Sequence, residues 1–276
     1  MRNKTLIINN YFPKHAADNA SLRARFRIGA MVTVLVLIIF AASQPAVAAD
    51  EKPASYANEQ YYDPFEPVNR VFFRFNQIFD EVLLKPIARL YIMVVPDGGR
   101  VIVSNVINNL KSPVILANDL LQGDLDRAQT TIARFATNSI IGFGGMGDVA
   151  ADLGAAPHSE DFGQTLAVHG VSKGPYVMLP FLGPSTVRDA IGQFVDTFFD
   201  PLGYVLSSEE AIARAGIEGL DKRANYLDVS EALEKTSIDY YASIRSVFLQ
   251  NRAYEIRNGV PEPIVDIYGD NPDSGN

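Results

Sequence analysis

The sequence predicts a domain built mainly of α-helices. Apolar residues recur every three or four positions through most of the chain, which is the spacing of an amphipathic helix. Proline, glycine and capping residues interrupt this pattern, and there is little strand-like alternation outside residues 164–171. With 276 residues, 47% of them hydrophobic, the chain has enough apolar material for one large domain or two small ones.

Residues 1–48 are predicted to be a secretory signal peptide. Three arginines precede an apolar run over residues 28–42, and the small residues at 46–48 suit a cleavage site. The run is shorter than the roughly 20 residues that cross a bilayer, so an uncleaved anchor is the less favoured alternative. Residues 49–62 are then the N-terminal segment of the mature chain.

The chain after the predicted signal peptide is acidic. Residues 49–276 hold 18 Lys or Arg and 31 Asp or Glu. This balance argues against a nucleic-acid partner and leaves membrane contact to apolar surface. The sequence has no cysteine, so we expect no disulfide, thiolate catalyst, cysteine-based metal site or lipidated cysteine.

The first helical pattern begins at residues 63–67, where an early proline and acidic residues favour a helix N-terminus. It is predicted to end or kink at Pro86, and a second apolar piece covers residues 86–95. Helical spacing resumes over residues 101–110 and, after a proline, over residues 114–121.

Asp124 is predicted to cap a longer helix that runs to about Ile141. The glycines within residues 142–147 end it, and residues 148–157 are predicted to be short helical or irregular structure. Residues 162–184 carry almost no charge and are rich in glycine and proline, which predicts a bent, ordered, apolar connector.

Ser185 can cap a further helix with an aromatic-rich face. A last long helical region begins near Ser208, with a break around Asp228, and continues to about Arg257. Residues 258–276 are predicted to be a disordered acidic tail.

Two short motifs suggest catalysis and are better explained by backbone geometry. Residues 142–147 match G-x-G-x-x-G but follow a helical pattern rather than a strand, which favours a helix end or hinge over dinucleotide binding. Residues 170–174 match G-x-S-x-G around Ser172. His158 and His169 both precede this serine, whereas the hydrolase order places the histidine after it. A tight turn is therefore favoured.

His158 and His169 are not at the spacing of metal ligands on a helix, so surface or turn histidines are favoured. The aspartates at positions 119, 124 and 126 bracket a glycine, as expected near helix ends. No residue pattern commits the chain to catalysis or to a cofactor.

Two helical faces, centred on residues 72–79 and 194–199, are bulky and aromatic. Taken alone, such faces are expected to pack into an ordinary helical core. Helices that lie in a membrane interface explain them too. Periodicity does not separate these alternatives.

Several blocks of the chain carry a family resemblance. The early ones are residues 63–70, Phe75-Asn76, residues 118–124, Arg134-Phe135 and residues 138–142. The most distinctive ones are Phe162-Gly163-Gln164-Thr165-Leu166, His169-Gly170-Val171, Gly174-Pro175-Tyr176, Leu179-Pro180-Phe181 and Arg188-Asp189. In this order they resemble the MlaA/VacJ family of outer-membrane phospholipid-transport proteins.

The resemblance implies an all-α, ring-like single domain of amphipathic helices over residues 63–257, with a central channel. It implies a protein of the outer membrane's inner leaflet that removes mislocalised phospholipids from the outer leaflet and thereby preserves lipid asymmetry. The implied partners are phospholipid, the outer membrane, a trimeric porin and a soluble periplasmic lipid carrier. No cofactor is implied, and no bond is made or broken.

The resemblance also implies roles for three groups of residues. Gly142, Gly144, Gly145 and Gly147 are expected to form a hinge beside the channel. The channel region is expected to include Phe162, Gly163, His169, Gly170, Gly174, Pro175, Tyr176, Pro180, Arg188 and Asp189. The candidates for membrane-facing side chains are Phe72, Phe75, Phe79, Phe194 and Phe198.

Many family members are acylated on a cysteine, which this chain lacks. We therefore expect a protein at the periplasmic face of the outer membrane that is exported by its signal peptide, is not a lipoprotein, and is held by its helices and a porin. Two alternatives to a lipid channel stay open: a secreted lipid hydrolase that uses Ser172, and a porin-associated scaffold without transport.

Overall fold

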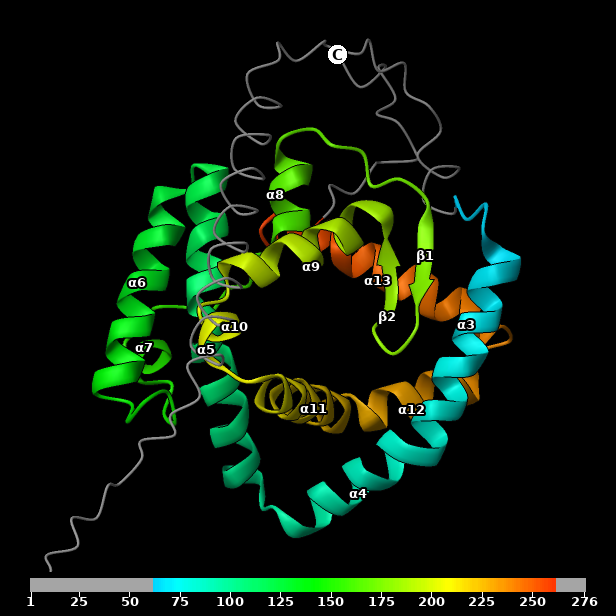
Figure 1. The fold of residues 1–276 in the computed structure, drawn as a ribbon, viewed down its shortest axis with the longest axis horizontal. Coiled ribbons are helices and arrows are strands. Elements are labelled where there is room, and N and C mark those ends of the chain that lie inside the picture. Colours follow the sequence, from blue (N-terminus) through cyan, green and yellow to red (C-terminus); the bar gives the residue numbers. More distant parts are fainter. Residues whose placement is uncertain (1–61, 262–276) are drawn as a thin grey trace, which may run out of the picture. The chain divides into compact units, whose positions relative to one another are not determined.

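The computed structural model describes residues 62–261, which belong to the compact unit Glu51–Asn276. The described residues are mainly helical, and one short hairpin supplies their two strands (Figure 1). The predicted all-α class is confirmed. The predictions of a signal peptide, of an irregular N-terminal segment up to residue 61, and of a tail from residue 262 onward lie outside the described residues.

The first helical stretch has three consecutive pieces. α3 (Glu66–Phe79) passes into a π-helical turn, η1 (Asp80–Leu84), and then into α4 (Lys85–Val94). Pro86 lies in the first turn of α4, where its missing N–H needs no partner. Of the two alternatives predicted at Pro86, an end or a kink, the end is therefore wrong: the π-turn just before Pro86 changes the hydrogen-bond register, and the helix continues.

α5 (Asp97–Gln122) is one helix of 26 residues, where two separate segments were expected. Pro113 lies inside it and removes a single backbone hydrogen bond, while α6 (Leu125–Ile140) packs along it. The Asp124 carboxylate accepts a backbone N–H of the first turn of α6 at 3.0 Å. This confirms the predicted N-cap.

The region that follows places helix and strand differently from the prediction. After α7 (Val149–Asp152), the residues with strand-like alternation form α8 (Phe162–Val168). The Asp161 carboxylate caps this helix by accepting the Gln164 N–H at 3.0 Å. Seven residues make only two helical turns, and over so short a span alternation does not distinguish strand from helix.

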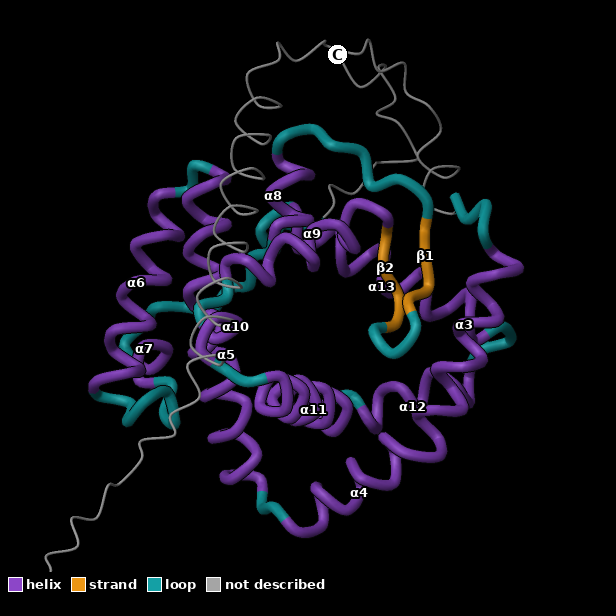
Figure 2. The backbone as a smooth tube through the Cα atoms, viewed as in Figure 1, coloured by secondary structure: helices purple, strands orange, loops and turns teal. Residues whose placement is uncertain are grey.

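The two strands lie inside the predicted connector. β1 (Tyr176–Leu179) pairs antiparallel with β2 (Gly183–Thr186), and Tyr176 faces Thr186 in the register (Figure 2). Phe181 in the intervening turn has a φ of 64° and Gly183 one of 87°. The bend that glycine and proline predict here is thus a tight hairpin.

The C-terminal half is helical again. α9 (Val187–Phe199) is capped by Thr186, one residue after the predicted Ser185. The other helices are α10 (Leu202–Val205), α11 (Ser208–Asn225), α12 (Leu227–Thr236) and α13 (Tyr240–Ile256). The predicted break near Asp228 falls at Tyr226, and residues 237–239 form a second break.

Within this unit the helices are arranged as a ring in the view of Figure 1, although not in sequence order: α9 runs back from the hairpin towards α10 beside α5, and α11 and α12 lie next to α4. The hairpin contacts α3 through β1 and α13 through β2, and its tip lies inside the outline of the ring (Figure 2). A small apolar core joins Tyr176, Met178, Tyr241 and Leu249 at this junction. Much of the helical surface is left available for other contacts.

Candidate functional site

The stretch α3–η1–α4 carries its apolar side chains on the surface. Its only buried residues are Asn69 and Ala88. The exposed large apolar side chains are Val68, Val71, Phe72, Phe75, Ile78, Val82, Leu83, Ile87, Leu90, Met93 and Val94. A helix of a water-soluble domain buries its apolar side, so a continuous exposed apolar surface marks contact with a membrane or another protein.

The predicted membrane-facing phenylalanines lie on two helices. Phe72 and Phe75 are exposed on α3, and Phe79 is half-buried at its end. On α9, Phe194 is exposed and packs edge-on against Phe198 at a centroid distance of 5.3 Å. Exposure is what lipid contact requires, and the contact itself stays a prediction.

Polar side chains fill much of the interior. Among residues 62–261, sixteen buried residues are polar or charged and twelve are apolar. A water-soluble domain has the reverse balance. The described part of the chain therefore combines an apolar surface with a polar interior.

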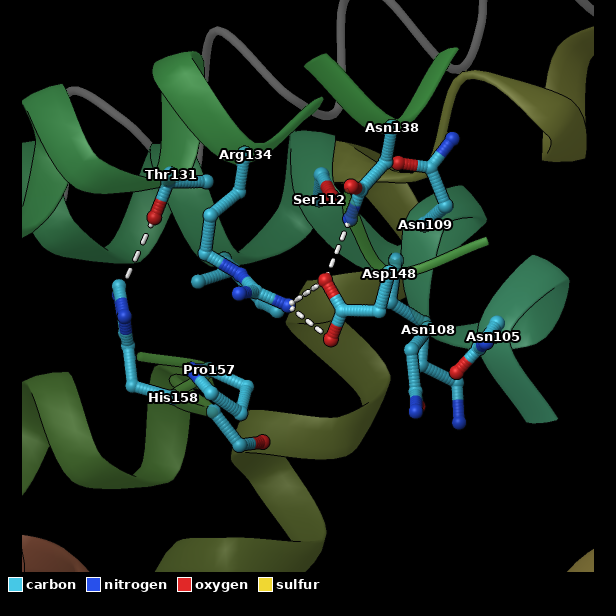
Figure 3. A pocket seen from close by; sticks show the side chains of 13 residues that line it. Asn105, Asn108, Asn109, Ser112, Thr131, Arg134, Asn138, Asp148, Pro157 and His158 are labelled. Carbon is cyan, nitrogen blue, oxygen red and sulfur yellow. Dashed lines mark hydrogen bonds and ion pairs between the residues drawn. The ribbon is translucent and has the colours of Figure 1, made fainter. Parts of the chain in front are cut away.

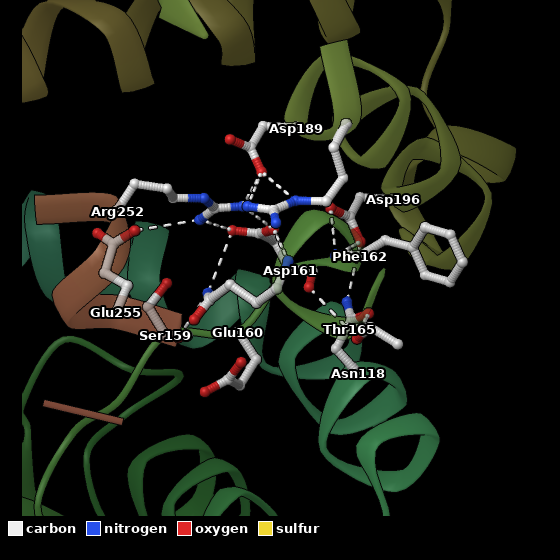
Figure 4. A network of polar contacts seen from close by, with 12 residues as sticks. Asn118, Ser159, Glu160, Asp161, Phe162, Thr165, Asp189, Asp196, Arg252 and Glu255 are labelled. Atoms are coloured by element: carbon white, nitrogen blue, oxygen red, sulfur yellow. Dashed lines mark hydrogen bonds and ion pairs between the residues drawn. The ribbon is translucent and has the colours of Figure 1, made fainter. Parts of the chain in front are cut away.

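Arg252 of α13 joins two other helices in this interior (Figure 4). Its guanidinium donates two hydrogen bonds of 2.6 Å to Asp161 at the start of α8 and one of 3.0 Å to Asp189 of α9. Arg188 donates to the same Asp189 oxygen at 3.3 Å, and the Thr186 hydroxyl donates to the other oxygen at 2.7 Å. Arg188 and Asp189 of the predicted channel region thus belong to a buried ionic network.

Two carboxylates of the network have pKa values shifted in opposite directions. Burial raises the pKa of Asp161, but the hydrogen bonds from Arg252 outweigh it and the net pKa is lowered. Burial raises the pKa of Asp196 to about 6, although Asn118 Nδ2 and the Phe162 N–H donate to it at 2.9 and 3.1 Å. Asp196 is therefore a half-buried carboxyl group whose pKa is raised to about 6.

Replacing Asp196 by Asn should change how stability depends on pH. The folded chain keeps the Asp196 proton up to about pH 6, whereas the unfolded chain releases it near pH 4. The stability from this proton is complete below pH 4 and is lost as pH rises through 6. Asp196→Asn, which stays neutral, should therefore favour folding by about 2 kcal/mol more at pH 7.5 than at pH 4.

Urea unfolding of both proteins at the two pH values measures this difference. Asp148→Asn is the matched control. Burial raises the pKa of Asp148, but the hydrogen bonds from Arg134 and Asn138 outweigh this effect, and the net pKa is lowered. That variant should instead lose nearly the same stability at pH 7.5 and at pH 4, because a carboxylate with a lowered pKa loses its contribution only as the pH falls below about 4. An equal effect of Asp196→Asn at both pH values would contradict the assignment.

A pocket of about 480 Å³ lies between α5, α6 and the loop before α8 (Figure 3). Asp148 at this pocket accepts two contacts of 2.9 Å from Arg134. The lining asparagines are Asn105, Asn108, Asn109 and Asn138. The Asn109 Oδ1 atom is buried and has no hydrogen-bond partner within the described residues. The pocket therefore offers amide groups and a paired arginine beside apolar lining atoms such as those of Ile115 and Pro157.

His158 at the edge of this pocket is largely buried, so the prediction of a surface or turn histidine is wrong for it. Its Nε2 lies 3.2 Å from both oxygens of Asp119 and 3.1 Å from the Thr131 hydroxyl. The Thr131 hydroxyl donates to Asp119 at 2.6 Å. Asp119 is fully buried, and a buried carboxylate needs donors of this kind.

The predicted hinge glycines lie in a turn that packs onto α5. A Cβ atom at Gly142 would lie 2.3 Å from the Gly147 carbonyl oxygen, and one at Gly145 would lie 2.6 Å from the Asn109 Cβ. Gly144 needs a φ of 74°, and Gly147 has room for a Cβ. Close packing thus explains why Gly142 and Gly145 have no side chain, and the positive φ explains why Gly144 is a glycine. Hinge motion stays a prediction.

The predicted channel region falls into two sets in the structure. The buried set is Phe162, Gly163, Tyr176, Arg188 and Asp189. The half-buried or exposed set is His169, Gly170, Gly174, Pro175 and Pro180. The first set joins α8, β1 and α9 in the interior, whereas the second lies in the turns between them.

The G-x-S-x-G segment forms a turn. The Ser172 Oγ accepts the Gly174 N–H at 3.4 Å, and Gly170 and Gly174 have positive φ. His169 Nδ1 lies 2.8 Å from the Thr165 carbonyl oxygen, and His158 contacts Asp119. Each described histidine thus has a partner other than the serine.

Among residues 62–261, no group of three or more His, Cys, Asp or Glu could hold a metal ion. No described helix is both long and apolar enough to cross a membrane.

Sequence reasoning missed several polar residues that organise the interior. Asn69 and Asn76 both bond to β1. They lie seven residues apart within the apolar pattern of α3, and polar residues at such spacing can indicate a buried contact. Arg252 gave no local signal, since Asp161 and Asp189 lie 91 and 63 residues away.

A model of the MlaA lipoprotein family matches residues 61–255. This chain belongs to the MlaA family. It is 35% identical to the intermembrane phospholipid transport system lipoprotein MlaA of Escherichia coli K12 over 207 residues, which cover 73% of this chain and 81% of that protein. The MlaA of Haemophilus influenzae is 29% identical over 214 residues, covering 76% of this chain and 84% of that protein.

A solved MlaA-like structure agrees with this assignment. It comes from a study of how the lipid asymmetry of the bacterial outer membrane is maintained. The two chains are 35% identical and align with a TM-score of 0.64, covering 70% of this chain and 98% of the solved one. The resemblance in the sequence blocks is thereby confirmed.

The prediction that the chain is not a lipoprotein is contradicted by these comparisons. The matching family and the relatives from Escherichia coli and Shigella flexneri are named lipoproteins. The prediction inferred a mode of membrane attachment from the lack of cysteine in the sequence. An absent residue type does not determine how a protein is attached.

Proposed function

We propose that this MlaA-family chain removes mislocalised phospholipids from the outer leaflet of the outer membrane and passes them towards the periplasm. The exposed apolar surface of α3–η1–α4 beside a polar interior carries the proposal. Apolar helix faces can lie among acyl chains, while interior polar groups offer a path for a headgroup. The names of the Escherichia coli relative and of the solved structure's study support it.

The proposal includes a central channel, a trimeric porin and a soluble periplasmic lipid carrier, all taken from the family resemblance. It is a transport function in which no covalent bond is made or broken. The hydrolase alternative is not favoured by the turn geometry around Ser172 or by the other partners of His158 and His169.

Deleting the gene should raise phosphatidylethanolamine in the outer leaflet several-fold, because lipids that arrive there are no longer removed. Labelling intact cells with a membrane-impermeant amine reagent measures this lipid. The wild-type gene and the Ser172→Ala variant should both restore the low level. Unchanged labelling after deletion would contradict the transport proposal. If the wild-type gene restores the low level and Ser172→Ala does not, the hydrolase is favoured.

A further inference from the structure

The pocket between α5, α6 and the loop before α8 has the size and depth of a small-molecule site. Its volume of about 480 Å³ lies in the range of such sites, roughly 300–1,000 Å³. Its buried lining residues are Asn109, Ser112, Thr131 and Asn138. Its exposed lining residues are Asn108, Pro157 and Ser159. A ligand can therefore enter between the exposed residues and reach the buried ones.

One buried polar atom of this pocket lacks a partner. Asn109 is 7% exposed, and its Nδ2 donates to the Ser139 hydroxyl at 3.0 Å, but no described residue donates to its Oδ1. The turn after α6 holds the amide in place, because a Cβ atom at Gly145 would lie 2.8 Å from Asn109 Nδ2. A buried carbonyl oxygen without a hydrogen bond is unfavourable. A ligand that donates a hydrogen bond to this oxygen therefore gains affinity.

The lysine, arginine and aspartate that line the pocket are already paired. Arg134 donates to both oxygens of Asp148 at 2.9 Å. Lys111 forms an ion pair with Glu218 of α11 at 3.4 Å. A phosphate or an ammonium group would have to compete with these pairs and would also lose its own hydration. The pocket therefore favours a ligand that is uncharged in the part it holds.

Hydroxyl groups suit the rest of the lining. Asn105, Asn108 and Asn109 lie on one side of α5, because they are three and four residues apart. An asparagine amide offers a carbonyl acceptor and an N–H donor, and a hydroxyl group is likewise both donor and acceptor. Ile115 and Pro157 supply apolar atoms for the C–H groups of a polyol. The lining thus matches both parts of such a ligand.

We propose that this pocket binds a neutral polyol, a glycerol-like or sugar-like group with neighbouring hydroxyls, one of which donates to Asn109 Oδ1. In Figure 3, Asn109 and Asn138 lie close to the Arg134–Asp148 pair, so the ligand's hydroxyls meet a polar end of the pocket. Such a group occurs as the headgroup of phosphatidylglycerol and as a free sugar. The proposal does not depend on the transport function, because its test is binding to the purified protein.

Isothermal titration calorimetry of the purified full-length protein in a mild detergent tests the site. The probes are dihexanoylphosphatidylglycerol, dihexanoylphosphatidylethanolamine and glucose, each also titrated into detergent alone. The two lipids share their acyl chains and differ in the headgroup, which is a diol in the first and an amine in the second. The amine lipid should bind at least about tenfold more weakly than the diol lipid. The chain is acidic, with 32 Asp or Glu against 24 Lys or Arg, so general charge attraction does not explain such a preference for the anionic lipid.

Two variants and one control assign the binding to this pocket. Asn109→Leu removes the buried acceptor at similar volume and should weaken polyol binding at least about tenfold. Asn108→Trp places a large ring at the mouth of the pocket and should weaken binding as much. Because Asn108 is exposed, this variant keeps its fold even if Asn109→Leu does not. Asn251→Trp, at an exposed asparagine of α13 outside the pocket, should bind like the wild type.

The outcomes distinguish the two sources of the polyol. If dihexanoylphosphatidylglycerol binds and Asn108→Trp weakens its binding, the site holds a lipid headgroup. If glucose binds with the same dependence on Asn108, the site accepts a free sugar. Either result supports the polyol site. The proposal is overturned if neither probe binds, if the amine lipid binds as tightly as either polyol, or if Asn108→Trp binds like Asn251→Trp.

Discussion

Replacing Arg252 by Met should lower the free energy of unfolding by about 3–5 kcal/mol. Arg252 is 9% exposed and supplies two hydrogen bonds of 2.6 Å to Asp161 and one of 3.0 Å to Asp189. Without it, Asp161 loses its bonded cation and Asp189 keeps only the longer contact of Arg188 at 3.3 Å, and an unpaired charge in the interior is costly. Urea unfolding of the purified variant in a mild detergent measures the loss.

Arg70→Met is the matched control. Arg70 also makes two ion pairs, with Asp239 at 2.6 Å and with Glu66 at 2.8 Å, but all three side chains are about 40% exposed. Water solvates the remaining carboxylates, so this variant should lose no more than about 1 kcal/mol. Equal losses in the two variants would show that the Arg252 network does not behave as a buried one.

Replacing Gly192 by Ala should destabilise the fold by about 3 kcal/mol through backbone crowding. A Cβ atom at Gly192 of α9 would lie 2.3 Å from the Gly163 backbone nitrogen and 2.7 Å from its Cα on α8. No side-chain rotation relieves a contact with backbone atoms, so the two helices must separate. That separation also strains the adjoining contact of Arg252 with Asp161 and Asp189.

Gly219→Ala provides the comparison for this variant. Gly219 lies within α11, and no atom lies within 4 Å of its potential Cβ. Alanine has the higher helix propensity, so this change should stabilise the protein by up to about 1 kcal/mol. Thermal unfolding midpoints of the two variants should therefore move in opposite directions. A neutral Gly192→Ala would mean that α8 and α9 are not in close contact.

Local signals in the sequence predicted much of the secondary structure. The Asp124 cap is an example, because capping depends on a few neighbouring residues. A helix end at Pro86 and the strand-like interpretation of residues 164–168 were wrong. At Pro86, a π-turn just before the proline lets the helix continue. At residues 164–168, two helical turns are too short for periodicity to distinguish a helix from a strand.

The candidate site was less predictable, because its contacts join distant parts of the chain. The family blocks indicated Gly163, Arg188 and Asp189, but not that Arg252 completes their network. The same limit applies to His158, since its partner Asp119 lies 39 residues earlier and looked like an ordinary helix-end residue. The burial of Arg252 and His158 depends on partners that are distant in the sequence, so no local pattern marks it.

By itself, the sequence determined the helical class, most of the helix boundaries and the MlaA family. Those conclusions depend on periodicity, caps and motif blocks, which are local. Only the tertiary structure decided that the aromatic face of α3 is exposed while Asn69 is buried. The physical reason is that an apolar helix face fits a core or a lipid layer equally well, and what packs against it is set by residues far away in the chain.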